Sequence, residues 1–216
     1  MKIALINESS VVAKNRMILE ELKGVCEPLG HQVFNYGMSE EDPDLDLSYV
    51  DIGYLTAILL NAKAVDFVVT GCSSGEGACM SSNSYPGVYC GYIKDPVDAY
   101  LFGQINDGNA ISLSYNKDFG LAGELNLRYI FREYFQSEHG IGYPQDRAAL
   151  QRAFQKDFAK MKSYICDDMG KVVERTDPLV TRKVCSGQVF QNSFFANCAE
   201  TSTTTALRTV LGEDAK

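Results

Sequence analysis

The clearest structural signal in the sequence is the stretch Val65-Asp-Phe-Val-Val-Thr-Gly-Cys-Ser-Ser-Gly-Glu-Gly-Ala78. Its apolar residues 67–69 are typical of a buried β-strand, and the glycine-rich turn after them leads into a helix. A strand, a tight turn and a helix in this order are the building unit of a parallel sheet. Because the first N–H groups of a helix lack intrahelical acceptors, this turn can hold an oxyanion or a phosphate.

Strand-like and helix-like segments alternate throughout residues 1–136. Strands are expected at residues 2–7, 32–36, 65–70, 87–93 and 110–113. The alternation predicts an α/β fold, a three-layer α/β/α sandwich with a five-stranded parallel sheet. Right-handed crossovers favour the flavodoxin-like strand order 2-1-3-4-5.

In that order, the strands at 2–7 and 65–70 are neighbours on either side of the topological switch point. Ligands of such sheets bind outside the carboxyl ends of the strands at this point. The chain order therefore predicts that the turn Asn7-Glu8-Ser9 meets the turn from Gly71 to Gly75.

Cys72 is the leading candidate for chemistry. A helix N-terminus lowers the pKa of a thiol, so Cys72 would act as a nucleophile or as a base toward a carbon-bound proton. A buried cysteine with a packing role alone is the alternative. Ser74 and Gly75 would bind an oxyanion, or Ser74 would cap the helix, and Glu76 would favour the helix dipole.

Composition argues against several classes of protein. The net charge of −8 argues against nucleic acid and anionic membranes as partners. We expect a cytoplasmic protein. The apolar runs are too short to span a membrane, and the first residues resemble a strand rather than a signal peptide. The seven cysteines lack short-spaced pairs, which suits a reducing compartment better than a disulfide framework. The spacing of Cys166, Cys185 and Cys198 is too wide for a usual zinc site, so no metal is expected.

Two domains or segments are expected along the chain. Residues 1–150 would form the catalytic domain, and residues 151–216 a helical and irregular extension that packs on a dimer. The segment 147–164 is predicted to be a charged helix, whereas residues 166–216 are poorly periodic and end in a helix over 203–211.

Two motifs carry a resemblance to a known family. The first is Val-Val-Thr-Gly-Cys-Ser-Ser-Gly-Glu-Gly-Ala with the later Asn-Ser-Tyr-Pro-Gly, within residues 68–87. The second is Asp-Pro-Val-Asp-Ala-Tyr followed by Gln-Ile-Asn-Asp-Gly-Asn-Ala-Ile, within residues 95–111. Both resemble the type B ribose-5-phosphate isomerases and galactose-6-phosphate isomerase subunits. The resemblance implies a metal-independent aldose–ketose isomerase of a sugar phosphate, without a cofactor, in a homodimer or tetramer whose site lies between subunits.

The resemblance also implies roles for individual residues. Cys72 would be the base that moves a proton between C1 and C2, Ser74 would replace a threonine that assists ring opening, and Asn106 would bind the enediolate oxygen. The remaining candidates for substrate binding are Glu8, Ser9, Ser73, Gly75, Glu76, Gly77 and Arg147.

The sequence departs from the family pattern at several positions. Ile105 stands where the family has the ring-opening histidine, and Ser9 stands where a second histidine lies. Of two phosphate-binding arginines, Arg147 matches one and Tyr143 replaces the other. An open-chain or non-phosphorylated substrate would fit these changes. A non-catalytic sugar-phosphate sensor is an alternative function, and a flavodoxin-like flavin or nucleotide binder is a third, although the first turn lacks its glycine pattern.

Overall fold

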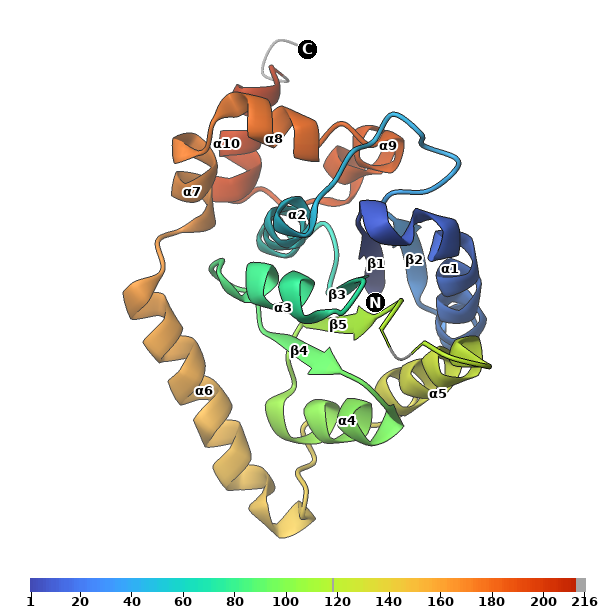
Figure 1. Cartoon of the computed structure of the whole chain (residues 1–216). Coiled ribbons are helices and arrows are strands. Elements are labelled where there is room, and N and C mark those ends of the chain that lie inside the picture. Colours follow the sequence, from blue (N-terminus) through green and yellow to red (C-terminus); the bar gives the residue numbers. More distant parts are fainter. Residues whose placement is uncertain (118, 213–216) are drawn as a thin grey trace.

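The computed structural model describes residues 1–117 and 119–212, and its five strands form one parallel sheet with helices on both faces (Figure 1). The strands are β1 (Lys2–Asn7), β2 (Gln32–Asn35), β3 (Phe67–Cys72), β4 (Cys90–Ile93) and β5 (Ala110–Ser114). One face is covered by α1 (Val12–Cys26), α4 (Pro96–Leu101) and α5 (Gly123–Phe135), and the other by α2 (Tyr49–Asn61) and α3 (Glu76–Asn83). The predicted α/β fold is confirmed.

The observed strand order is β2-β1-β3-β5-β4, so the predicted order 2-1-3-4-5 is wrong at its last two strands. Ala110 of β5 pairs with Val68 of β3 on one side and with Cys90 of β4 on the other. The apolar strand β5 takes the central place, whereas Gly91 and Tyr92 of β4 are half-buried at the edge. Because the chain reverses direction at β4, right-handed crossovers place α3 and α4 on opposite faces.

Helix α2 is buried on all sides. It begins with a capping box, in which the Ser48 side chain accepts the N–H of Asp51 and the Asp51 carboxylate accepts that of Ser48. All residues from Asp51 to Leu59 are buried. A helix that is apolar all round needs cover on both sides, and α2 has the sheet on one side and the C-terminal helices on the other.

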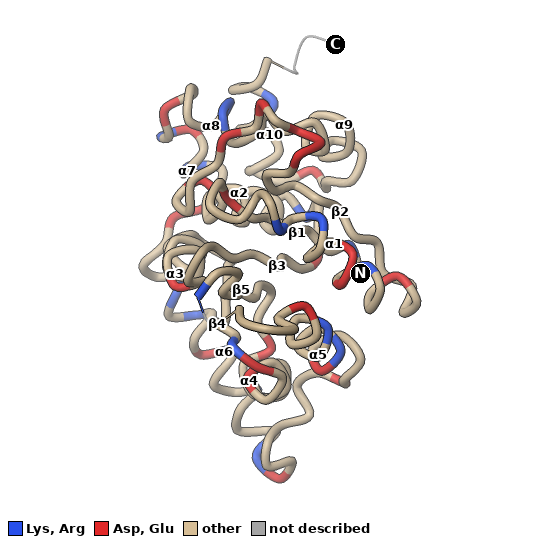
Figure 2. Tube along the Cα trace, turned by 45° about the vertical axis from the view of Figure 1, so that its right-hand side comes forward, with Lys and Arg blue, Asp and Glu red and all other residues tan. Residues whose placement is uncertain are grey.

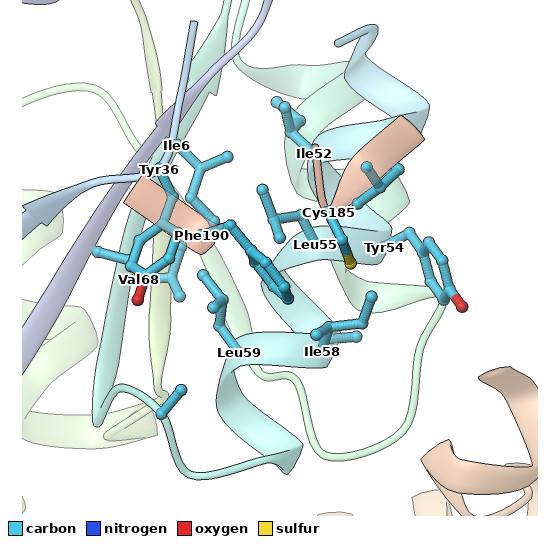
Figure 3. Packing of buried hydrophobic residues seen from close by; sticks show 14 of the residues in the cluster. Ile6, Tyr36, Ile52, Tyr54, Leu55, Ile58, Leu59, Val68, Cys185 and Phe190 are labelled. Atoms are coloured by element: carbon cyan, nitrogen blue, oxygen red, sulfur yellow. The ribbon is translucent and has the colours of Figure 1, made fainter. Parts of the chain in front are cut away.

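The C-terminal segment forms helices that pack on α2. Helix α6 (Ala148–Ile165) runs along the side of the molecule and leads to the others (Figure 1). These are α7 (Met169–Arg175), α8 (Pro178–Val184), α9 (Gln188–Asn197) and α10 (Ser202–Leu211). The predicted helix over 203–211 is confirmed as α10, and the irregular structure expected before it is largely helical. Figure 3 shows Cys185 and Phe190 among the side chains of Leu55, Ile58 and Leu59.

The described residues carry no helix long and apolar enough to cross a bilayer. Figure 2 shows basic and acidic residues both on the side of α6 and around α7 to α10. The cysteines are free thiols. Within residues 1–117 and 119–212, no three histidine, cysteine, aspartate or glutamate side chains gather as a metal site requires, so Cys166, Cys185 and Cys198 do not come together.

Candidate active site

The turn after β3 presents a thiol at the carboxyl edge of the sheet. Cys72 is the last residue of β3 and is 8% exposed. The backbone N–H of Gly75 donates to Cys72 Sγ at 3.2 Å. Helix α3 begins at Glu76, so the thiol lies at a helix N-terminus.

Gly75 is required by the geometry of this turn. Its φ of 78° lies in the left-handed region, and a Cβ atom there would lie 2.7 Å from the carbonyl carbon of Leu113 and from the ring of Tyr92. Its carbonyl accepts the Ser112 hydroxyl at 2.7 Å. The turn is therefore pressed against β5, where no side chain fits.

The chain after β5 forms a second wall beside the turn. The Ser73 carbonyl accepts the backbone N–H groups of Asn116 at 3.1 Å and Lys117 at 2.9 Å, and also the Ser114 hydroxyl at 3.0 Å. The Asn116 side chain donates to Ser73 Oγ at 2.8 Å. Sequence reasoning missed Asn116 and Lys117, because the expected strand order kept β5 away from β3.

Glu8 lies on the other side of the turn, where the two turns meet as the chain order predicts. Its carboxylate is buried and accepts the Ser10 N–H at 2.9 Å, the Ser9 hydroxyl at 3.2 Å and the Ser10 hydroxyl. The Ser10 and Ser73 hydroxyl oxygens are 2.8 Å apart. Glu8 therefore reaches the Cys72 turn through Ser10.

The other candidates in the turn lie at the start of α3. The Ser74 hydroxyl accepts the N–H of Glu76 at 3.4 Å, a weak capping contact. The Glu76 carboxylate forms an exposed ion pair with Lys117, with Nζ and Oε1 3.1 Å apart. Gly77 packs on the ring of Tyr49, which a Cβ atom would approach to 3.0 Å. The first N–H groups of α3 lack intrahelical acceptors and can bind an oxyanion.

Asn106 and Arg147 lie apart from this turn. Asn106 ends the π-helical turn Phe102–Asn106 just before β5, so it lies at the amino edge of the sheet, opposite Cys72. Arg147 is exposed just before α6. The Gln155 side chain of α6 donates to the Ile105 carbonyl at 2.7 Å and ties α6 to this edge. Within a single chain, Asn106 and Cys72 therefore lie at opposite edges of the sheet.

A groove of about 920 Å³ lies between α6 and the amino edge of the sheet. Asn106 and Ile105 line it, and so does Lys162, whose buried ammonium donates to the carbonyls of Asn83 and Val88. Burial lowers the pKa of Lys162. Large apolar side chains of α6 are exposed along the groove, namely Phe154, Phe158, Met161 and Ile165. Such a surface is typical of an interface between proteins.

His139 does not replace the histidine that is absent at Ile105. Its Nδ1 lies 3.3 Å from Asp107 Oδ1, and its Nε2 donates to the Tyr134 carbonyl at 2.6 Å. The hydrogen bond to Asp107 raises the pKa of His139. Both ring nitrogens of His139 are therefore already engaged by groups of the same chain.

The sequence of residues 3–149 matches the profile of the family described as Ribose/Galactose Isomerase. The chain belongs to the ribose/galactose isomerase family. The resemblance inferred from the two motifs is thus confirmed, and the enzyme is a sugar isomerase, an intramolecular oxidoreductase. The non-catalytic sensor is accordingly not retained.

Two solved structures resemble this isomerase along nearly its whole length. One is a 4-deoxy-L-threo-5-hexosulose-uronate ketol-isomerase complexed with a tartrate, with 48% identity and a TM-score of 0.94 over 98% of this chain and 100% of that chain. The other is a ribose-5-phosphate isomerase from Vibrio parahaemolyticus, with 47% identity and a TM-score of 0.93 over 97% and 99% of the two chains.

More distant members of the family share the fold alone. A type B ribose 5-phosphate isomerase from Trypanosoma cruzi has 18% identity and a TM-score of 0.62 over 76% of this chain and 98% of its own. None of the curated protein sequences compared with the chain matches it.

Proposed function

We propose that this isomerase interconverts the aldehyde and ketone forms of an open-chain uronic acid, with Cys72 as the base. The observation that carries the proposal is Ile105, an apolar side chain at the position of the family's ring-opening histidine. His139 is held by Asp107 and does not take over that role. A substrate without a ring to open explains both facts.

The chemistry named for the hexosulose-uronate relative fits this requirement. An aldose closes its ring when a hydroxyl on C4 or C5 adds to C1. A 4-deoxy-5-hexosulose has no hydroxyl on C4 and a ketone at C5, so it lacks both groups. Its carboxylate has less charge than a phosphate, and one arginine can grip it in two hydrogen bonds. Arg147 would supply that grip, with Tyr143 in place of the second arginine.

In the proposed mechanism the Cys72 thiolate removes the proton from C2. The electron pair of that C–H bond forms the C1=C2 bond, and the charge moves to the oxygen on C1. N–H groups of the turn from Ser73 to Gly77 bind this enediolate, with Ser74 beside them. The hydroxyl proton on O2 passes to O1, and the thiol returns its proton to C1, which leaves a ketone at C2.

A homodimer would complete the site. Cys72 and Asn106 lie at opposite edges of the sheet in one chain, and the groove beside Asn106 exposes an apolar face of α6. We propose that a second copy covers this face and brings its own turn against Asn106 and Arg147. Glu8 and Ser9 would then contact the substrate from the side of Cys72.

Proton exchange tests the reaction and its substrate. The enzyme is incubated in D₂O with 4-deoxy-L-threo-5-hexosulose uronate and, separately, with ribose 5-phosphate, the substrate favoured by the name of the Vibrio relative. We expect deuterium in the uronate product and a fall of about 10² to 10⁴ in rate with Cys72→Ala. Faster turnover of ribose 5-phosphate would reject the uronate, and full exchange by Cys72→Ala would reject the base.

Mixed dimers test the shared site. Cys72→Ala and Asn106→Ala are each expected to be nearly inactive. If each site combines Cys72 of one subunit with Asn106 of the other, random pairing of the two variants restores about a quarter of the wild-type activity. No recovery after the subunits have exchanged would contradict the arrangement.

A further inference from the structure

The C-terminal helices hold the segment 38–47, which connects β2 to α2. Helix α9 begins after Gly187, which has no side chain to cap it. The cap comes instead from Asp42, whose carboxylate accepts the N–H of Gln188 at 2.7 Å. Leu45 packs beside Gly187, where a Cβ atom would lie 3.2 Å from Leu45 Cδ2. The middle of the segment is thus fixed to the N-terminus of α9.

A second link holds the end of the same segment. Lys183 of α8 donates to the Asp51 carboxylate at 2.9 Å and lies 3.7 Å from that of Asp46. Asp51 is the residue that closes the capping box of α2. The C-terminal helices therefore contact the segment at two points, separate from their apolar packing on α2.

The segment in turn contacts the chain on both sides of Glu8. The Leu47 carbonyl accepts the backbone N–H of Ser9 at 3.0 Å. Met38 donates its N–H to the Asn7 carbonyl at 3.0 Å, and its carbonyl accepts the Asn7 side chain at 3.0 Å. Glu8 lies between these two attachments, and through Ser10 it meets Ser73 beside Cys72.

We infer that Asp42 is a positioning residue of the active site. By capping α9 it holds the segment 38–47 against Asn7 and Ser9, and so keeps Glu8 at its place beside the Cys72 turn. This gives the helices after α6 a role in catalysis through geometry, since no hydrogen bond or ion pair of the described residues joins these helices directly to the Cys72 turn. The inference rests on the proposed function for its catalytic readout, and a second readout is independent of activity.

The experiment compares three variants of the full chain. Asp42→Ala removes the cap, Asp42→Asn keeps an oxygen that can accept the Gln188 N–H, and Asp44→Ala changes an exposed carboxylate for which the described residues provide no hydrogen bond or ion pair. For Asp42→Ala we expect KM for the hexosulose uronate to rise about fivefold, the factor that one helix cap represents, with kcat within about twofold. Asp42→Asn should recover most of the loss, and Asp44→Ala should match the wild type.

Amide hydrogen exchange supplies the independent readout. The N–H groups of Ser9 and Met38 form the two backbone hydrogen bonds between the segment 38–47 and the chain on either side of Glu8. Both N–H groups should therefore exchange about fivefold faster in Asp42→Ala, and at the wild-type rate in Asp44→Ala. Unchanged exchange at both amides would overturn the inference, even for a variant with a lower melting temperature. If no substrate is turned over, the proposed function fails, and the exchange rates still decide the role of Asp42. Lys183→Met tests the second link in the same way.

Discussion

The hydroxyl oxygen of Ser10 lies 2.8 Å from that of Ser73, and this contact joins the turn after β1 to the turn after β3. The Asn116 side chain adds a third member, because it donates to Ser73 Oγ at 2.8 Å and to the Ser10 carbonyl at 3.1 Å. The segments after β1, β3 and β5 thus contribute one side chain each to the support of the Cys72 turn.

The Asn116 side chain is predicted to contribute to activity by holding the Cys72 turn in place. Asn116→Ala removes the two hydrogen bonds that the side chain donates, and also the one that its Oδ1 accepts from Lys14 Nζ at 2.7 Å. It should lower kcat/KM about tenfold, since a turn displaced by a fraction of an ångström binds an enediolate less well. The control is Asn126→Ala, which removes a side-chain hydrogen bond to the Lys94 carbonyl, a contact that is not among those supporting the turn. Equal losses in both variants would show that Asn116 does not act on the site.

Gly75→Ala should destabilise the chain more than Gly30→Ala does. Both glycines have almost the same left-handed backbone, with φ of 78° and 79°, but nothing lies within 4 Å of a Cβ atom at Gly30. We expect a cost of about 1 kcal/mol at Gly30 for the backbone alone, and about 3 kcal/mol at Gly75, where the Cβ atom also meets Leu113. Urea unfolding of the two variants measures the difference. Equal costs would mean that the turn moves away from β5 freely.

His139 predicts a stability that depends on pH. Its raised pKa in the folded chain means that the protonated ring is stabilised, chiefly by Asp107. In the unfolded chain the pKa returns to about 6.5. The stabilisation is therefore complete below about pH 6.5 and is lost as the pH rises through the folded-state pKa.

The variant His139→Gln measures this effect. The measured quantity is the free energy of unfolding of the wild type minus that of the variant. This difference should be larger at pH 5.5 than at pH 9 by about 0.5 to 1 kcal/mol, as for a partly exposed ion pair. His31 is the contrasting control, because burial lowers its pKa and its contribution falls as the pH falls. A difference at His139 that grows toward pH 9 would contradict the assigned pair with Asp107.

The C-terminal helices are predicted to be part of the stable core. Phe194 is fully buried, and its ring stacks on Phe190 with centroids 4.3 Å apart. Phe194→Ala should cost about 3 to 5 kcal/mol, because it opens a cavity against α2. Leu121→Ala, at a fully exposed side chain, should stay within about 0.5 kcal/mol. A small loss at Phe194 would indicate that α7 to α10 fold separately from the sheet.

The sequence predicts much of the sheet and the meeting of two turns, but not the place of β5. The alternation of strands and helices and the glycine-rich turn suffice for the α/β fold. Chain order alone put β4 beside β3. The composition of the two strands is the better signal for which of them is central. Residues 110–113 are apolar or small throughout, as in a central strand, whereas Gly91 and Tyr92 of β4 are half-buried, as in an edge strand. The wrong order also hid Asn116 and Lys117, which follow β5.

The C-terminal helices were missed for a different reason. Helices α7, α8 and α9 are short, so their periodicity is weak, and their stability comes from packing rather than from propensity. A signal for them lies elsewhere in the chain. Residues 49–61 are apolar on every face, and a surface helix of this sheet would not be. The sequence of α2 thus predicts a cover, although it does not say which segment supplies it.

The burial of α2 on both sides also has a consequence for how the chain is made. Its outer face is covered by helices that end 150 residues later, at residue 211 against residue 61. At ribosomal rates this face stays bare for on the order of ten seconds after α2 is synthesised. During that interval the nascent chain carries an uncovered apolar helix. A chaperone that binds apolar segments would therefore find one in α2 during this interval.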